Sequence, residues 1–141
     1  MTQSWVFWAL ISAAFAALTA IFGKVGVANI SSDMATLIRT VVILVVIALI
    51  VASTGQWQPL SSIGSKTWLF LCLSGLATGA SWLAYYRALK LGDASRVAPI
   101  DKLSIVLVAI FGVIFLSEKL SLVHWFAVTM IASGAIMLAV F

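Results

Sequence analysis

Apolar positions along the chain are grouped in long blocks, separated by short polar segments. Five of these blocks approach the roughly 20 residues that a membrane-spanning helix needs. None shows the period-two alternation of a membrane β-barrel strand. The pattern therefore predicts five transmembrane helices, over residues Trp5–Phe22, Asp33–Ala52, Lys66–Leu91, Val97–Leu116 and Leu122–Phe141.

The segments between the blocks carry residues that start and stop helices. Gly23-Lys24-Val25-Gly26 is predicted to end the first helix, and Ser31 and Ser32 are good N-cap residues for the second. The second helix is closed by the turn Thr54-Gly55-Gln56-Trp57-Gln58-Pro59, because Gly and Pro interrupt helices. Gly92 is placed as the C-terminal stop of the third helix.

Composition agrees with this pattern. Of the 141 residues, 64% are hydrophobic and 9% are charged, and the mean hydropathy is +1.22. A soluble domain carries roughly a quarter charged residues, so a soluble fold of this size could not cover so much apolar surface. The fold class expected is an all-α integral membrane protein, with residues 1–141 forming a single domain.

The charged and reactive residues exclude several other classes of protein. The formal charge of +4 comes from scattered cations that form no basic stripe, so a nucleic-acid partner is not expected. Cys72 is the single cysteine, which rules out an internal disulfide, and no Cys/His cluster has the spacing of a zinc site. No nucleophile–base pair or Gly-rich phosphate loop is present. We therefore expect no cofactor, no metal and no enzymatic activity.

Charged residues inside the predicted spans need an explanation, because a charge there costs several kcal/mol. Arg39 either extends its side chain to the lipid headgroups or faces a polar cavity. Asp101 and Lys102 follow Pro99, so the fourth helix either starts at Pro99, with Asp101 as a first-turn acid, or breaks there. A break would place Asp101 at the kind of discontinuity where transporters bind ions and substrates. Arg39, Arg87 or Lys102 could neutralise it.

The third span combines small and aromatic residues. Gly75-x-x-x-Gly79 allows close helix packing, and the same small face could instead line a cavity. Trp82, Tyr85 and Tyr86 either form the wall of a binding cavity or fill the core between helices.

Loop cations bear on orientation in the bilayer. One face holds the N-terminus, Lys66 and Lys119, and the other holds Lys24, Lys90 and Arg96. Arg87 and Lys102 lie either on that second face or inside the bundle, and the bias is smaller if they are inside. The positive-inside rule therefore favours a cytoplasmic C-terminus, although the small difference leaves insertion in both orientations open.

Four motifs together resemble one known family. Arg87–Ser95 (RALKLGDAS) leads into Val97–Ile100 (VAPI), and Phe115–Leu120 (FLSEKL) is followed by Ala132–Ala135 (ASGA). In this order they closely resemble the EamA domain of the drug/metabolite transporter superfamily, over nearly the whole chain. The glycine that usually precedes the Glu in this family is Ser117 here.

The resemblance implies a five-helix bundle that forms one EamA-type repeat. Many family members join two such repeats in opposite orientations around a substrate cavity, so a single-repeat chain is expected to pair as a homodimer, plausibly antiparallel, in a bacterial inner membrane. The function implied is secondary transport or export of small metabolites, amino-acid-like compounds or drugs by alternating access. An alternative is a small membrane subunit that binds or flips lipid-linked intermediates or assists a larger membrane protein. Residues expected to face the cavity are Arg39, Trp82, Tyr85, Tyr86 and Asp101.

Overall fold

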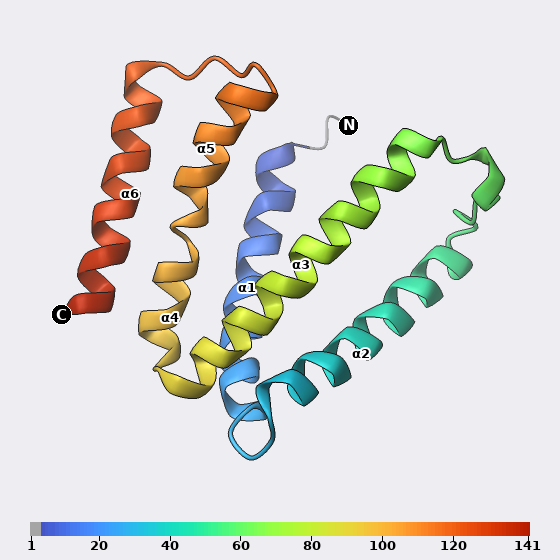
Figure 1. Ribbon diagram of the computed structural model, residues 1–141, viewed down its shortest axis with the longest axis horizontal. Coiled ribbons are helices and arrows are strands. Elements are labelled where there is room, and N and C mark those ends of the chain that lie inside the picture. Colours follow the sequence, from blue (N-terminus) through green and yellow to red (C-terminus); the bar gives the residue numbers. More distant parts are fainter. Residues whose placement is uncertain (1–3) are drawn as a thin grey trace. The chain divides into compact units, whose positions relative to one another are not determined.

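The computed structural model of the chain describes residues 4–141, which are helical with no strand among them (Figure 1). Within this range, five helical segments are long and apolar enough to cross a membrane. The prediction of an all-α membrane protein with five spans is therefore confirmed. The elements are α1 (Trp5–Gly26), α2 (Ser32–Ser53), the 3₁₀ helix η1 (Leu60–Ser62), α3 (Ser65–Leu91), α4 (Ala94–Asp101), α5 (Ser104–Phe115) and α6 (Leu122–Val140).

The first span ends later than predicted, at Gly26 instead of Phe22. A glycine inside a helix costs only about 1 kcal/mol relative to alanine, so Gly23 does not stop it. Lys24, in the last turn, lies close to the negative end of the helix dipole, which stabilises that turn. Its Nζ donates a hydrogen bond to the Gly92 carbonyl oxygen at 2.8 Å.

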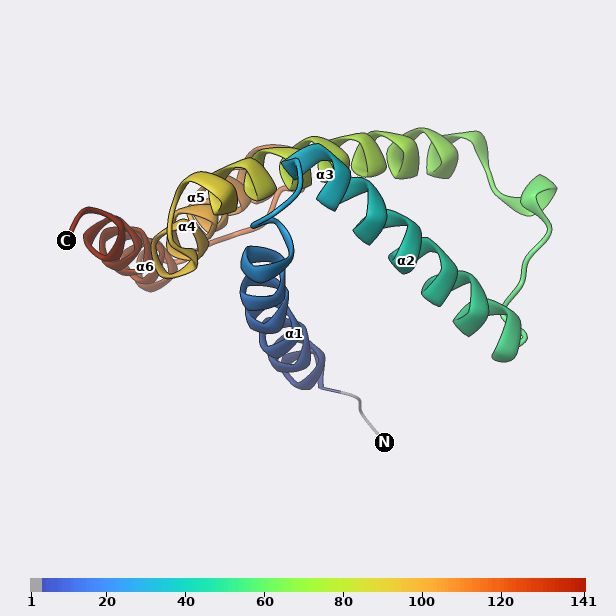
Figure 2. The same ribbon diagram turned by 90° about the horizontal axis from the view of Figure 1, so that it is seen from below.

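The described chain folds as two units. The hairpin unit, residues 25–90, contains α2, η1 and α3, and the terminal unit, residues 4–24 and 91–141, contains most of α1 together with α4, α5 and α6. In the hairpin unit α2 and α3 run antiparallel. They lie closest where α2 begins and α3 ends, and they separate toward η1 (Figures 1 and 2).

The start of α2 follows from its capping residues. Ser31 has an extended backbone, and its Oγ accepts a hydrogen bond from the Met34 backbone N–H at 3.2 Å. This contact satisfies one of the N–H groups that the first turn of a helix leaves unpaired, and the predicted N-cap is thereby confirmed. Asp33 in the first turn lies at the positive end of the helix dipole, where an acidic side chain is favourable.

The fourth span, in the terminal unit, consists of two helices, α4 and α5, that follow one another along α6 (Figure 1). Pro99 lies inside α4 and has no N–H to donate to the preceding turn. Beyond it the chain tightens: the Lys102 N–H donates to the Pro99 carbonyl at 3.0 Å, and the Leu103 N–H donates to the Ile100 carbonyl at 3.0 Å. These bonds to the third residue back are the 3₁₀ type, and they separate the two helices.

Large apolar side chains remain exposed along the spans. Leu76 in α3 is 73% exposed and Phe126 in α6 is 67% exposed, as is usual for surfaces that lipid covers. In the hairpin unit the buried residues lie near the start of α2 and the end of α3, and the terminal unit buries Ala20, Gly23, Gly112 and Ala135. The buried residues of the hairpin unit are Val27, Ala35, Thr36, Tyr86 and Leu89.

Candidate functional site

Arg39 lies about 10 Å along α2 from its first residue, inside an otherwise apolar span. The side chain is half-buried, so it does not extend freely into the surroundings. Its guanidinium packs on aromatic rings instead. The Cζ atom is 4.0 Å from the centroid of the Trp82 ring and 5.3 Å from that of the Tyr86 ring.

Trp82 and Tyr86 reach Arg39 from one face of α3. They are separated by one helical turn, which places their side chains next to each other on that face. Both rings are within the distance at which a cation is attracted to an aromatic π-system. Tyr85 contacts Tyr86 in turn: the two rings meet edge to face, with centroids 6.3 Å apart. We call Arg39, Trp82 and Tyr86 the aromatic clamp.

The aromatic clamp leaves one strong hydrogen-bond donor unused. Arg39 Nη1 is buried and has no hydrogen-bond partner among the described residues. A buried donor without a partner costs about 1–3 kcal/mol, and a charged one costs more. The aromatic faces balance part of the charge, but they do not replace a hydrogen bond. An anion that reached Nη1 would supply the missing acceptor.

A pair of polar contacts joins the ends of the two helices beside the aromatic clamp. Arg87 Nε donates to Asp33 Oδ1 at 3.2 Å and Arg87 Nη2 donates to Asp33 Oδ2 at 3.0 Å, a bidentate ion pair. One turn further, Lys90 Nζ donates to the Ile30 carbonyl oxygen. Both side chains of the ion pair are more than half exposed, so its main effect is to fix the register of α2 against α3.

Sequence reasoning missed the Arg87–Asp33 pair, because it considered Arg87 as a partner for Asp101. The signal that could have found it is the spacing of the residues in an antiparallel pair of helices. When two residues are in contact across such a pair of helices, the sum of their residue numbers is nearly constant along the pair. Arg87 with Asp33 and Lys90 with Ile30 both give a sum of 120. Arg39 with Trp82 nearly continues this register.

Asp101 lies in the terminal unit, at the last position of α4. The expectation that it is a first-turn acid of a helix beginning at Pro99 is therefore wrong, because the span begins earlier, at Ala94. The alternative, a break in the fourth span, is confirmed. Lys102 Nζ binds Asp101 Oδ2 at 3.1 Å and neutralises the carboxylate locally. A shared cavity for Asp101 and Arg39 stays a prediction, because the two residues belong to different units.

The turn before α6 contains a non-glycine residue with positive φ, at the position where the resemblance leads us to expect glycine. Ser117 has φ +56, in the left-handed region that glycine adopts readily and residues with a Cβ atom avoid. This conformation turns the chain at the end of α5, so that the Glu118 N–H donates to the Gly112 carbonyl at 3.1 Å.

Comparison with known proteins now settles the family. A model of the EamA-like transporter family matches residues 3–140. The chain belongs to this family. Its sequence is 76% identical over 141 residues, the full length of both chains, to a Sinorhizobium sp. protein named "Uncharacterized transporter in cobO 3'region". No solved structure matches the chain significantly.

Family membership confirms the resemblance found in the sequence motifs. The match extends over nearly the whole chain, so the EamA-like repeat includes both the aromatic clamp and the broken fourth span. The protein is an integral membrane protein and a transporter of the drug/metabolite type.

Proposed function

We propose that this EamA-like protein is a secondary transporter or exporter that moves small metabolites, amino-acid-like compounds or drugs by alternating access. The observation that carries the proposal is the aromatic clamp. A half-buried guanidinium inside a membrane span, held on two rings with Nη1 unsatisfied, is costly as a purely structural feature. Ionisable groups retained in spans commonly mark substrate or ion pathways.

Each predicted cavity residue has a role in this proposal. Arg39 attracts a negative group of the substrate or pairs with Asp101 during the transport cycle. Trp82, Tyr85 and Tyr86 contact its apolar part. Asp101 lies at the end of α4, beside the break between α4 and α5, and discontinuous helices of this kind commonly surround transporter binding sites.

The assembly proposed is an antiparallel homodimer in the inner membrane of a bacterium. An odd number of spans places the two ends of the chain on opposite faces of the bilayer, so an inverted second copy can complete a two-repeat transporter. Extensive apolar surface on the spans is available for contact with lipid or with that second copy.

The proposal is tested by comparing solutes exported from cells that express wild-type protein or single variants. Mass spectrometry of the medium should identify compounds whose export requires the wild-type chain. We expect Arg39→Ala and Asp101→Asn each to remove most of that export at equal protein levels. Lys66→Gln serves as a control, because Lys66 is exposed at the start of α3, away from the aromatic clamp.

Two results would contradict the proposal. If both Arg39→Ala and Asp101→Asn export like wild type, these residues do not form the substrate site. If no solute depends on the chain, and the solubilised protein is found only with a larger membrane protein, it is an accessory subunit instead. The solubilised mass expected from the proposal is that of two copies.

A further inference from the structure

A stripe of residues on α3 extends from the aromatic clamp along the helix. Gly75, Gly79, Trp82 and Tyr86 follow one another at intervals of four, three and four residues, which is the spacing of a single helix face. The half of this face next to Arg39 is aromatic, and the half further from it has no side chains. A Cβ atom added at Gly75 or Gly79 would meet nothing within 4 Å, so the space beside these glycines is open.

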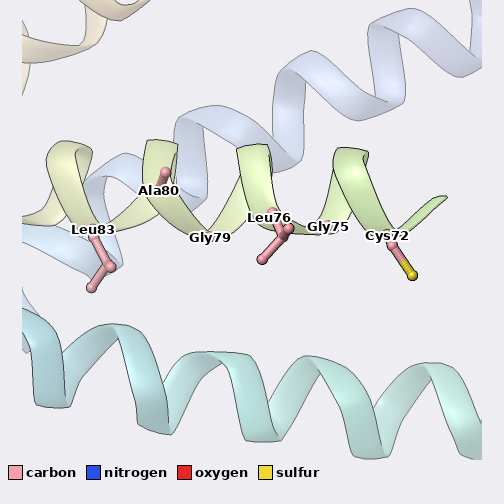
Figure 3. A pocket seen from close by; sticks show the side chains of 6 residues that line it. All are labelled: Cys72, Gly75, Leu76, Gly79, Ala80 and Leu83. Carbon is pink, nitrogen blue, oxygen red and sulfur yellow. The ribbon is translucent and has the colours of Figure 1, made fainter. Parts of the chain in front are cut away.

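This open space forms a groove along α3 with a volume of about 760 Å³. Figure 3 shows the side chains of Leu83, Leu76 and Cys72 pointing to the side on which α2 lies. The groove is about 16 Å long, from the rise of an α-helix between Cys72 and Leu83. Its lining is almost entirely apolar, and consists of Cys72, Gly75, Leu76, Gly79, Ala80 and Leu83.

The groove and the aromatic clamp offer complementary chemistry in adjacent turns of one helix. Leu83, at one end of the groove, follows Trp82 directly in the sequence. An apolar body placed along the glycines would therefore end within one to two turns of Trp82 along α3, and Trp82 contacts Arg39. The volume is within the range of roughly 300–1,000 Å³ that is usual for small-molecule sites, which are mostly apolar with a few polar groups.

We propose that the substrate is an amphipathic organic anion, whose carboxylate binds the Arg39 guanidinium while its apolar body lies in the α3 groove. This inference rests on the proposed function and narrows its substrate class. Arg39 is the cation of the hairpin unit that has a buried nitrogen without an acceptor, among residues 25–90. A carboxylate or similar oxyanion is the natural partner of a guanidinium.

The same contacts disfavour cationic and zwitterionic substrates. The acidic residue of the hairpin unit is Asp33, and both its oxygens are already bound by Arg87. An ammonium group in the groove would find no free carboxylate in this unit and would be repelled by Arg39. The proposed class is therefore a monoanion with an apolar chain or ring, in preference to an amino acid or a cationic drug.

Four probes test this assignment, and each has a phenyl ring at the end of a three-carbon chain. They are 3-phenylpropanoate, its amide, 3-phenylpropylamine and phenylalanine. Binding is measured by calorimetry on purified protein in phosphatidylcholine nanodiscs. We expect saturable binding of 3-phenylpropanoate, at least about tenfold tighter than the other three, because a charge-assisted hydrogen bond is lost or opposed in each of them.

Variants separate the two parts of the site. Arg39→Gln should abolish the preference for 3-phenylpropanoate over its amide. Arg39→Lys keeps the positive charge and should retain part of the preference, which would show that the position tolerates substitution. Gly79→Leu fills the groove and should weaken both ligands about tenfold, since burial of the ring is lost. Gly134→Leu in α6 is the matched control, because a Cβ there also meets nothing within 4 Å. It should bind like wild type.

The proposal is overturned if 3-phenylpropanoate does not bind, if the amide or phenylalanine binds equally well, or if Gly134→Leu weakens binding as much as Gly79→Leu. Phosphatidylglycerol added to the nanodiscs tests a lipid as the occupant. If it displaces 3-phenylpropanoate competitively, the groove holds a lipid anion and the substrate assignment is wrong. Because these measurements report binding alone, they separate the two proposals: selective binding of 3-phenylpropanoate without any transport would contradict the proposed function but not the assignment of the anion site.

Discussion

At the scale of single residues, the unusual side chains of this protein are those that break a local rule. Arg39 places a charge in an apolar span, and its contacts with Trp82 and Tyr86 stabilise that charge by an attraction on the order of 1–2 kcal/mol. Its Nη1 is buried without a hydrogen-bond partner among the described residues. Departures from local rules commonly mark functional sites, which is why Arg39 carries the functional argument.

Ser117 breaks a different rule, with consequences for stability alone. A glycine adopts φ +56 without the steric cost that Ser117 carries. We expect Ser117→Gly to raise the free energy of unfolding by about 0.5–1 kcal/mol, after the greater entropy of glycine in the unfolded chain is subtracted. Titration with denaturing detergent measures this change.

The control for Ser117→Gly is the same substitution in the same turn, at Ser121. Ser121 has an extended backbone and caps α6, where its Oγ contacts the His124 backbone N–H and ring Nδ1. Ser121→Gly should therefore lower stability slightly. If both substitutions change stability in the same direction, the positive φ of Ser117 is not the cause of its effect.

At the scale of elements, the sequence determined where helices form more clearly than how they contact each other. The number and approximate place of the spans and the Ser31 cap were predictable, because they depend on local hydropathy and on neighbouring residues. The bounds were less so, since the first span ends at Gly26 and the fourth begins at Ala94. The Arg87–Asp33 pair was not, because helix register across a loop depends on tertiary contacts. Trp82 and Tyr86 were predicted as cavity residues, but their contact with Arg39 became visible only in the structure.

The fourth span also shows that local sequence does not determine every helix bound. Pro99 indicated two alternatives, a helix start or a break, and the conformational preferences of proline are compatible with both. The structure places Pro99 within α4, with the break at Lys102 and Leu103. Both α4 and α5 pack against α6, and single-sequence patterns do not report such tertiary contacts.

The break can be tested with the two prolines of the chain. Pro99→Ala restores an N–H that can donate to the Ser95 carbonyl, so we expect α4 to gain about 1–3 kcal/mol of stability. If the break is needed for transport, export should decrease although the protein becomes more stable. Pro59→Ala is the control, since Pro59 precedes η1 outside the spans and should change neither property. A stabilised Pro99→Ala protein with full export would show that the break is structural only.

At the scale of the whole molecule, the antiparallel dimer requires that the chain insert in both orientations. The loops expected on the C-terminal face carry more Lys and Arg than those on the other, which favours one orientation. The difference is small, however, because Lys66 and Lys119 on one face stand against Lys24, Lys90 and Arg96 on the other. Nearly equal numbers of Lys and Arg on the two faces are the condition for insertion in both orientations.

Orientation is measured directly by labelling single cysteines in intact cells with a membrane-impermeant thiol reagent. In a Cys72→Ser background, Ser65→Cys and Asn29→Cys place the thiol at exposed positions on opposite ends of the hairpin unit. If both orientations coexist, we expect roughly half of the copies to label at each position, as an inverted pair requires. A chain inserted in one orientation would label fully at one position and not at the other. That result would exclude the antiparallel homodimer, because no inverted copy would then be available to complete the two-repeat cavity.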